Sequence, residues 1–210
     1  MKQTSPFHSV IRLPNQFEVL DLSGAIDIDP SIIYSVGKYN EERPLMYQKH
    51  LFLGDDDVRF IHMGIDIGAP MGTPVYNFDD GILISQGYLP DSGDYGYCMV
   101  LEYVWRQVKP LKGRSYYIEA GELYWGLYGH LSASSLQLHS VGDRIPFGNK
   151  IAMLGTQHEN GGWAPHLHFQ LSFTKPKGFD MPGVVSLAER ERALDLYPDP
   201  RQVLGPLYVT

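Results

Sequence analysis

Cysteine is nearly absent from this 210-residue sequence, in which Cys98 stands alone. A single cysteine excludes an intrachain disulfide, and it also excludes structural zinc sites built from two or four thiolates. Cys98 is therefore expected to be a small buried hydrophobic residue on a strand rather than a nucleophile. The lack of disulfides is compatible with a reducing compartment.

Long hydrophobic runs and an excess of basic residues are missing as well. No apolar run approaches the roughly 18–20 residues that cross a bilayer, and residues 1–8 lack the apolar core of an export signal. The formal net charge is −7 and the pI is about 5.5, with no basic stripe. We expect a cytoplasmic protein with neither a nucleic-acid nor a membrane partner. The sequence gives no oligomeric state.

Turn-forming residues recur through the middle of the chain and divide it into short strands. Clusters of Gly, Pro, Asp and Asn punctuate residues 61–172, and the 22 glycines fit many tight turns. This spacing predicts a mainly β protein with an antiparallel sheet or sandwich as its core. We expect an N-terminal extension over residues 1–45 packed on the core, a β domain over 46–175 and a C-terminal extension over 176–210.

Three local elements are predicted outside this strand pattern. Residues 17–22 fit a strand, and residues 105–122 fit a long, partly charged hairpin with an exposed tip at 109–114. The one convincing helix covers 186–194, with Ser186 as its N-cap and Glu189 completing a capping box.

Three short histidine motifs follow one another along the chain: His62–Asp66, Tyr128–Ser132 and His166–His168. Together they supply two imidazoles and one carboxylate for a metal, and two more imidazoles for proton transfer. Three protein ligands with an open fourth position are typical of a catalytic zinc site, whereas a structural site is closed by four. The set predicts a metal-dependent hydrolase.

Residues 166–173 alternate strictly between polar and apolar, as a strand with one buried face does. His166 and His168 therefore project from the same face, with Cα atoms roughly 6.5–7 Å apart. From this motif alone, a solvated strand face that carries two histidines is an equal alternative.

The other two motifs can form a site only if the fold leaves space at His130 and bends the chain between His62 and Asp66. The strand over 123–130 places His130 on the face of Tyr124, Gly126 and Tyr128, and small glycines beside His130 leave space over that face. An ordinary histidine at a strand end is the alternative. On a straight strand His62 and Asp66 would lie about 13 Å apart, too far for donors that sit about 2.0–2.2 Å from one zinc. The segment has to bend, which Gly64 permits; otherwise it holds a buried histidine and a surface aspartate.

The three motifs in this order resemble the lysostaphin-type zinc endopeptidases, also called the β-lytic or glycyl-glycine endopeptidase family. The resemblance covers roughly residues 62–173. Beyond the histidine motifs it includes Gly-Ala-Pro-Met-Gly-Thr-Pro-Val at 68–75, Asp-Gly at 80–81, Val-Gly-Asp at 141–143 and Trp-Ala-Pro at 163–165.

The resemblance implies a compact, mostly antiparallel β core with the metal in a groove. It implies Zn²⁺ as cofactor, held by His62, Asp66 and His168, with His130 and His166 as the catalytic pair. It implies an endopeptidase that cleaves an amide bond of a peptide through metal-activated water. The roles of base and acid stay undivided between the two catalytic histidines.

The sequence departs from the family pattern in the insertion at 105–122, in the long loop 155–163 and in its lack of a visible export signal. The loop and tail also resemble the metallopeptidase-like segment of large proteins with kinase-like and aminotransferase domains, which would fit an intracellular role. Two alternatives follow: an intracellular zinc hydrolase of a small amide or metabolite, and a non-catalytic binding or regulatory module. We expect surface positions for four other histidines (His8, His50, His139, His158) and a solvated turn at 55–57.

Overall fold

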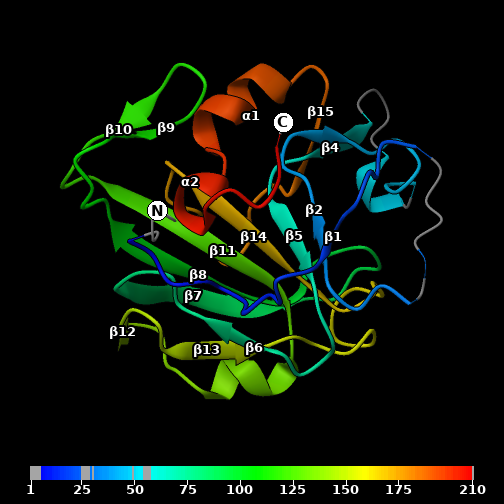
Figure 1. Cartoon of the computed structure of the whole chain (residues 1–210), viewed down its shortest axis with the longest axis horizontal. Coiled ribbons are helices and arrows are strands. Elements are labelled where there is room, and N and C mark those ends of the chain that lie inside the picture. The colour runs from blue at the N-terminus through cyan, green and yellow to red at the C-terminus, as the bar shows by residue number, and fades with distance from the viewer. Residues whose placement is uncertain (1–5, 25–28, 30, 49, 54–57, 210) are drawn as a thin grey trace.

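The computed structural model describes residues 6–24, 29, 31–48, 50–53 and 58–209, and it confirms a mainly β protein. Its main layer is an eight-stranded sheet, antiparallel except where its first two strands pair (Figure 1). In spatial order the strands are β1 (Glu18–Val19), β2 (Ser35–Gly37), β5 (Ile65–Gly68), β14 (His166–Ser172), β11 (Leu123–Leu131), β8 (Gly96–Val104), β7 (Gly81–Leu89) and β12 (Arg144–Ile145).

Smaller elements flank this sheet. A two-stranded sheet pairs β6 (Pro74–Tyr76) with β13 (Lys150–Met153), at the side of the molecule opposite the C-terminal helices (Figure 1). A three-stranded sheet has the order β15 (Val184–Ser186), β4 (Arg59–His62) and β3 (Glu41–Glu42). Two 3₁₀ helices, η1 (His50–Phe52) and η2 (Ala133–Gln137), complete the connections.

Both faces of the main sheet are buried, and β11 shows how the alternation is used. Tyr124 and Tyr128 pack into the larger core cluster, whereas Trp125 and Leu127 pack into a second cluster on the other face. Cys98 lies on β8 in the second cluster and is fully buried, as expected. Because β11 and β14 are neighbours, the histidines of the second and third motifs lie on adjoining strands.

The insertion and the C-terminal tail differ in detail from the predictions. The hairpin is short, pairing β9 (Leu111–Lys112) with β10 (Tyr117–Ile118), and Leu111 inside the predicted exposed tip is fully buried. The reason is a tertiary contact: Gln202 bonds both backbone groups of Lys112, and Asp195 accepts from Ser115. The C-terminal elements therefore cover the outer edge of the hairpin.

The helix begins later than the sequence predicted. α1 spans Arg190–Leu196 and a further short helix, α2, spans Arg201–Leu204, while Ser186 belongs to β15. The Ser186 hydroxyl still accepts a hydrogen bond from the Glu189 amide, 3.3 Å away, so the capping contact forms before the helix. Residues 184–186 form a strand rather than the start of the helix because β15 pairs with β4 and buries Val185.

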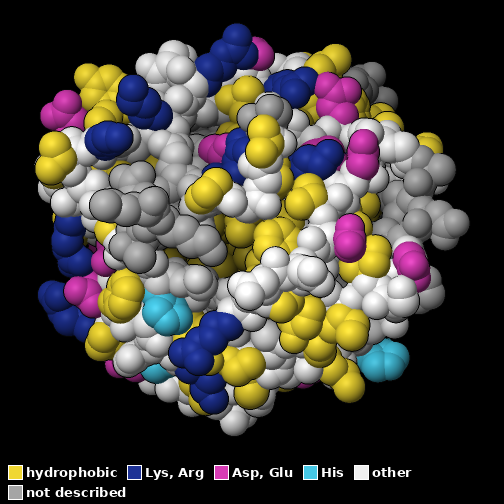
Figure 2. Space-filling model, in the orientation of Figure 1, with side chains coloured by type: hydrophobic (Ala, Val, Ile, Leu, Met, Phe, Trp, Pro, Cys, Tyr) yellow, Lys and Arg dark blue, Asp and Glu magenta, His cyan; other side chains and the backbone are white. Residues whose placement is uncertain are grey.

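Several predictions about the periphery can be compared with the structure. Residues 18–19 of the predicted 17–22 strand form β1, and the His158 side chain is exposed, whereas His8 and His139 are half-buried. The His50 side chain and residues 55–57 lie outside the described residues. Acidic, basic and hydrophobic side chains are interspersed on the face shown in Figure 2, without a basic stripe. Among the described residues, no helix has the length and apolarity to span a membrane.

Candidate metal centre

A change of sheet between His62 and Asp66 brings this pair together. His62 ends β4 in the three-stranded sheet, and Asp66 lies on β5 in the main sheet. The bend places His62 Nε2 only 3.2 Å from Asp66 Oδ1. Gly64 is needed for space: a Cβ there would lie 2.5 Å from Cε1 and 2.6 Å from Nε2 of His168. The bend expected from the sequence is therefore present, and the glycine lets an imidazole approach the backbone.

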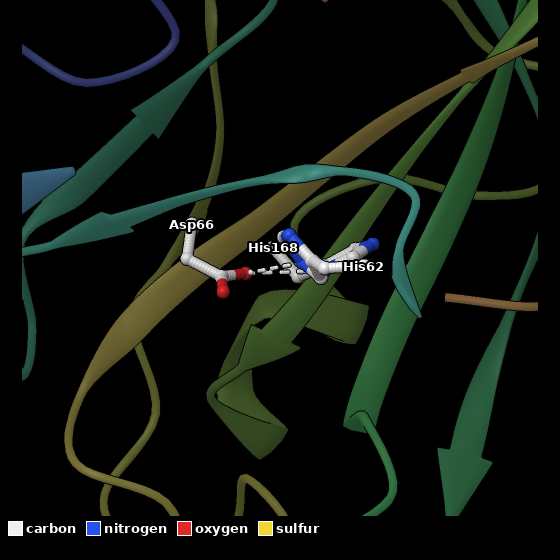
Figure 3. A group of neighbouring side chains, drawn as sticks. All are labelled: His62, Asp66 and His168. Carbon is white, nitrogen blue, oxygen red and sulfur yellow. Dashed lines mark hydrogen bonds and ion pairs between the residues drawn. The ribbon is translucent and has the colours of Figure 1, made fainter. Parts of the chain in front are cut away.

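Strand β14 supplies the third donor. His168 pairs with Asp66 across the β5–β14 ladder, and its Nδ1 atom lies 3.1 Å from Asp66 Oδ1 and 3.0 Å from His62 Nε2. The carboxylate of Asp66 points toward the two imidazoles (Figure 3). Two donors on a tetrahedral zinc, each about 2.0–2.2 Å from it, would lie about 3.3–3.6 Å apart. The three donor atoms form a triangle, and its sides are within a few tenths of an ångström of the donor–donor distances that zinc requires.

The outward nitrogens of both imidazoles are fixed by oxygen acceptors. His62 Nδ1 lies 2.9 Å from the carbonyl oxygen of Lys38, and His168 Nε2 lies 3.0 Å from Gln170 Oε1. The Gln170 amide is oriented in turn, since its Nε2 donates to the carbonyl of Pro182. A nitrogen that faces an oxygen acceptor carries the hydrogen, so the opposite nitrogen of each neutral ring has a lone pair.

This hydrogen-bond pattern tests whether the residues fit a cation. Two nitrogen lone pairs and a carboxylate oxygen converge within 3.0–3.2 Å of one another. Such an arrangement is repulsive unless a positive charge lies between the three atoms. Imidazole and carboxylate are ligands that zinc accepts, and the carbonyl and amide behind the imidazoles are the outer partners usual for such ligands. The donor set therefore fits Zn²⁺.

The second oxygen of Asp66 is held by a buried arginine. Arg43 is fully buried, and its Nη1 donates to Asp66 Oδ2 at 2.7 Å. Its Nε donates to Glu41 Oε2 at 2.9 Å, and its Nη2 donates to the same Lys38 carbonyl that orients His62. Arg43 therefore holds one donor residue, Asp66, directly and contacts the carbonyl that orients a second, His62.

His130 and His166 lie beside this triangle with their rings 4.1 Å apart between centroids. His130 Nδ1 lies 2.9 Å from the carbonyl of Asn160, and His166 Nδ1 lies 2.7 Å from the carbonyl of Ala164. Each Nδ1 therefore carries the hydrogen, which leaves Nε2 with a lone pair; His166 Nε2 is 3.8 Å from Asp66 Oδ1. The geometry presents two unprotonated imidazole nitrogens next to the donor triangle.

The backbone at His130 departs from regular strand geometry. The register between β11 and β8 shifts between Tyr128 and Leu131, and His130 has a φ of 64°. A non-glycine residue in this left-handed region is uncommon, and such residues cluster at functional sites. The conformation is fixed on both sides, because the His130 amide donates to Tyr95 O and the His130 carbonyl accepts from Gly155 N. The bulge turns His130 away from the regular alternation of the strand.

Burial and neighbouring charges set the protonation of these groups. Burial, with the Arg43 charge second, lowers the pKa of His62 to about 4. Burial alone would raise the pKa of Asp66, but His62 and Arg43 hold it well below its usual value. Burial also lowers the pKa of His130, well below the usual value, and that of His166. At neutral pH these groups are an ionised carboxylate and neutral imidazoles, which are the forms that bind a metal and accept protons.

All five predicted site residues line one groove of about 660 Å³. The sequence had pointed to these five, and the structure brings all of them together. The sequence did not indicate Arg43, Gln170 or the Asn160 carbonyl, because each acts through contacts between distant segments. Gln170 has one signal that could have found it: it shares the polar face of β14 with His166 and His168.

Comparison with known proteins bears on the family. The model for peptidase family M23 matches residues 60–179, which is more than half of the chain. The peptidoglycan DD-endopeptidase ShyA of Vibrio cholerae serotype O1 is 29% identical over 110 residues, covering 52% of this chain. This chain spans about a fifth of that relative's length, since the match covers 20% of it.

Solved structures are similar to parts of this chain as well. A zinc-containing peptidase from Vibrio cholerae is 28% identical over 60% of this chain and 30% of its own, with a TM-score of 0.38. The antimicrobial peptidase lysostaphin from Staphylococcus simulans is 22% identical over 84% of this chain and 53% of its own, with a TM-score of 0.47. On the strength of the family match over residues 60–179, this chain belongs to peptidase family M23.

Proposed function

We propose that this chain is a zinc endopeptidase that hydrolyses an amide bond of a peptide lying in the groove. The observation that carries the proposal is the convergence of three metal donors within 3.0–3.2 Å, next to two neutral imidazoles whose Nε2 atoms are unprotonated. A module that only binds a partner would not need the second pair of histidines, His130 and His166. The family membership supports the same conclusion.

In this mechanism His62, Asp66 and His168 hold the ion, and His130 and His166 move protons. When bound, zinc supplies Lewis-acid polarisation of the scissile carbonyl and of the attacking water. The Nε2 atoms of the catalytic pair accept a proton from that water and pass one to the leaving amine. Their lowered pKa values keep both imidazoles unprotonated at neutral pH, as proton acceptors have to be.

The family membership favours a peptide over a small metabolite as substrate, and the groove has room for a short peptide. The groove volume of about 660 Å³ lies in the middle of the range of roughly 300–1,000 Å³ for ligand sites, and side chains from the β1–β2 region to the segment before β15 line it. A relative carries the name peptidoglycan DD-endopeptidase, so a peptidoglycan peptide is one candidate and a protein-derived peptide is another. The cytoplasmic location stays a prediction, which fractionation of the source cells would test.

The test combines metal content with turnover. Purified protein is expected to hold about one zinc per chain by elemental mass spectrometry, to lose it to a chelator and to regain it. Zinc-loaded protein is expected to cleave at least one substrate in a panel of muropeptides and proteome-derived peptides, and the His130→Ala variant to bind zinc without cleaving. Full activity of His130→Ala would refute the catalytic assignment, and failure to bind zinc would refute the metal centre.

A further inference from the structure

Part of the groove lining is made of apolar side chains from the N-terminal part of the chain. We call it the apolar wall; its members are Leu20, Leu22, Ile33, Leu45, Met46 and Phe52. All six lie before residue 60, outside the region that matches the family model. Away from the metal centre, the charged side chains that line the groove among the described residues are Arg59, Asp94 and Asp180, none of which belongs to the wall.

The apolar wall is continuous with the metal centre. Met46 Sδ lies 3.9 Å from Nη1 of Arg43, the same atom that donates to Asp66 at 2.7 Å. On the main sheet Gly37 of β2 pairs directly with Asp66, and the Leu20 amide donates to Val36 of β2. A peptide amide held at the metal would therefore carry its neighbouring side chains along this wall.

Two members of the wall are open to solvent. Ile33 is 62% exposed and Leu45 is 50% exposed. Large apolar side chains that are exposed together in a groove, next to reactive groups, mark a surface that a ligand covers. Phe52 and Leu22, two other members of the wall, are buried.

We propose that the apolar wall selects peptides that carry a bulky apolar side chain, of the leucine or phenylalanine kind, beside the scissile bond. The inference rests on the proposed function, because it takes the groove to be the peptide site. A peptide with glycine or alanine at this position would leave the apolar wall exposed to water. A leucine side chain would cover it, and the resulting preference over glycine is expected to be about tenfold or more in affinity.

Binding to a variant that cannot turn over substrate tests this preference directly. Zinc-loaded His130→Ala protein is titrated into fluorescein-labelled peptides of the form Gly-Gly-Ala-Xaa-Ala-Gly-Gly, and dissociation constants are measured by fluorescence polarisation. The central residue is Leu, Ser or Gly. The leucine peptide is expected to bind at least about tenfold more tightly than the glycine peptide.

Exposed members of the wall provide the matching variants. Ile33→Ser and Leu45→Ser, each made in the His130→Ala background, are expected to weaken binding of the leucine peptide and to leave the glycine peptide unchanged. Val141→Ser is the control, since Val141 is 59% exposed and does not line the groove. Zinc content and thermal unfolding are measured for each variant, so that a loss of binding is separated from a loss of fold.

The outcomes separate this inference from the proposed function. Equal affinities for the three peptides, no binding of the leucine peptide, or no effect of the wall variants would overturn the inference. Leucine-selective binding without zinc-dependent cleavage of any peptide by the unsubstituted chain would uphold the wall and refute the endopeptidase. Zinc-dependent cleavage without selective binding of the leucine peptide would uphold the endopeptidase and refute the role of the wall.

Discussion

Replacing Arg43 with methionine tests how the fold supports the metal ligand Asp66. The change removes four hydrogen bonds to oxygen: those to Asp66 Oδ2 at 2.7 Å, to Glu41 Oε2 at 2.9 Å, to the Lys38 carbonyl at 3.1 Å and to the Tyr47 hydroxyl at 3.2 Å. Methionine fills similar space but leaves the Asp66 carboxylate without its cation, whereas Glu41 keeps its ion pair with Lys38 at 3.2 Å. Breaking a buried pair in this way costs about 3–5 kcal/mol of folding stability.

The effect on zinc affinity has two opposing parts. Loss of a positive charge near the ion would strengthen binding, whereas loss of the hydrogen bonds that orient Asp66 and the Lys38 carbonyl would weaken it. We expect the loss of orientation to be the larger part, because removing such outer partners of metal ligands weakens metal binding about 10–100-fold, or about 1.4–2.7 kcal/mol.

The assay is zinc competition with a chromophoric chelator at pH 7.5, with urea unfolding of the metal-free protein in parallel. Arg43→Lys keeps the charge and is expected to fall between the wild type and Arg43→Met, because an ammonium group lacks the planar fork that reaches all four partners. Arg106→Met is the control: Arg106 is half exposed and pairs with Asp79 and Asp80 at 3.3 and 3.4 Å, so zinc affinity should not change. Folded Arg43→Met protein with wild-type zinc affinity would refute the reasoning.

Three further predictions follow from the same geometry. Gly64→Ala places a methyl group about 2.5 Å from the His168 ring, so the affinity for zinc should fall. Gly24→Ala is the control, because a Cβ at Gly24 has open space and the zinc affinity should stay unchanged. Chelator competition on both variants measures the two affinities. His168→Ala should abolish tight zinc binding, and one zinc per chain by elemental mass spectrometry in that variant would exclude His168 as a ligand. Acid should destabilise the metal-free protein, because the pKa of His62 is lowered from 6.5 to about 4 in the folded state. The unfolded chain therefore binds the proton first as the pH falls. The folding stability that is present above pH 6.5 is lost as the pH falls toward 4. At pH 5 this loss is roughly 2 kcal/mol from His62 alone, and urea unfolding that shows equal stability at pH 7.5 and pH 5 would contradict it.

The sequence by itself determined the class of fold and the chemistry of the site. Turn spacing predicted an antiparallel β protein, because strand length and turn residues are local properties. The alternation over residues 166–173 placed His166 and His168 on one face, because the strand period is two residues. Residue types alone excluded disulfides and thiolate zinc sites, and the four histidines and one aspartate of the motifs named the candidate site.

The tertiary structure decided what depends on distant segments. His62 and Asp66 meet because the chain changes sheet between them, and His130 turns toward the groove because a bulge forces its backbone to a positive φ. Arg43, Gln170 and the Asn160 carbonyl support the site through contacts across the fold that no local pattern records. Leu111 in the hairpin is buried rather than exposed for the same reason, since residues from α1 and α2 pack on the hairpin. Local sequence sets which side chains are available, whereas the sheet order sets which of them meet.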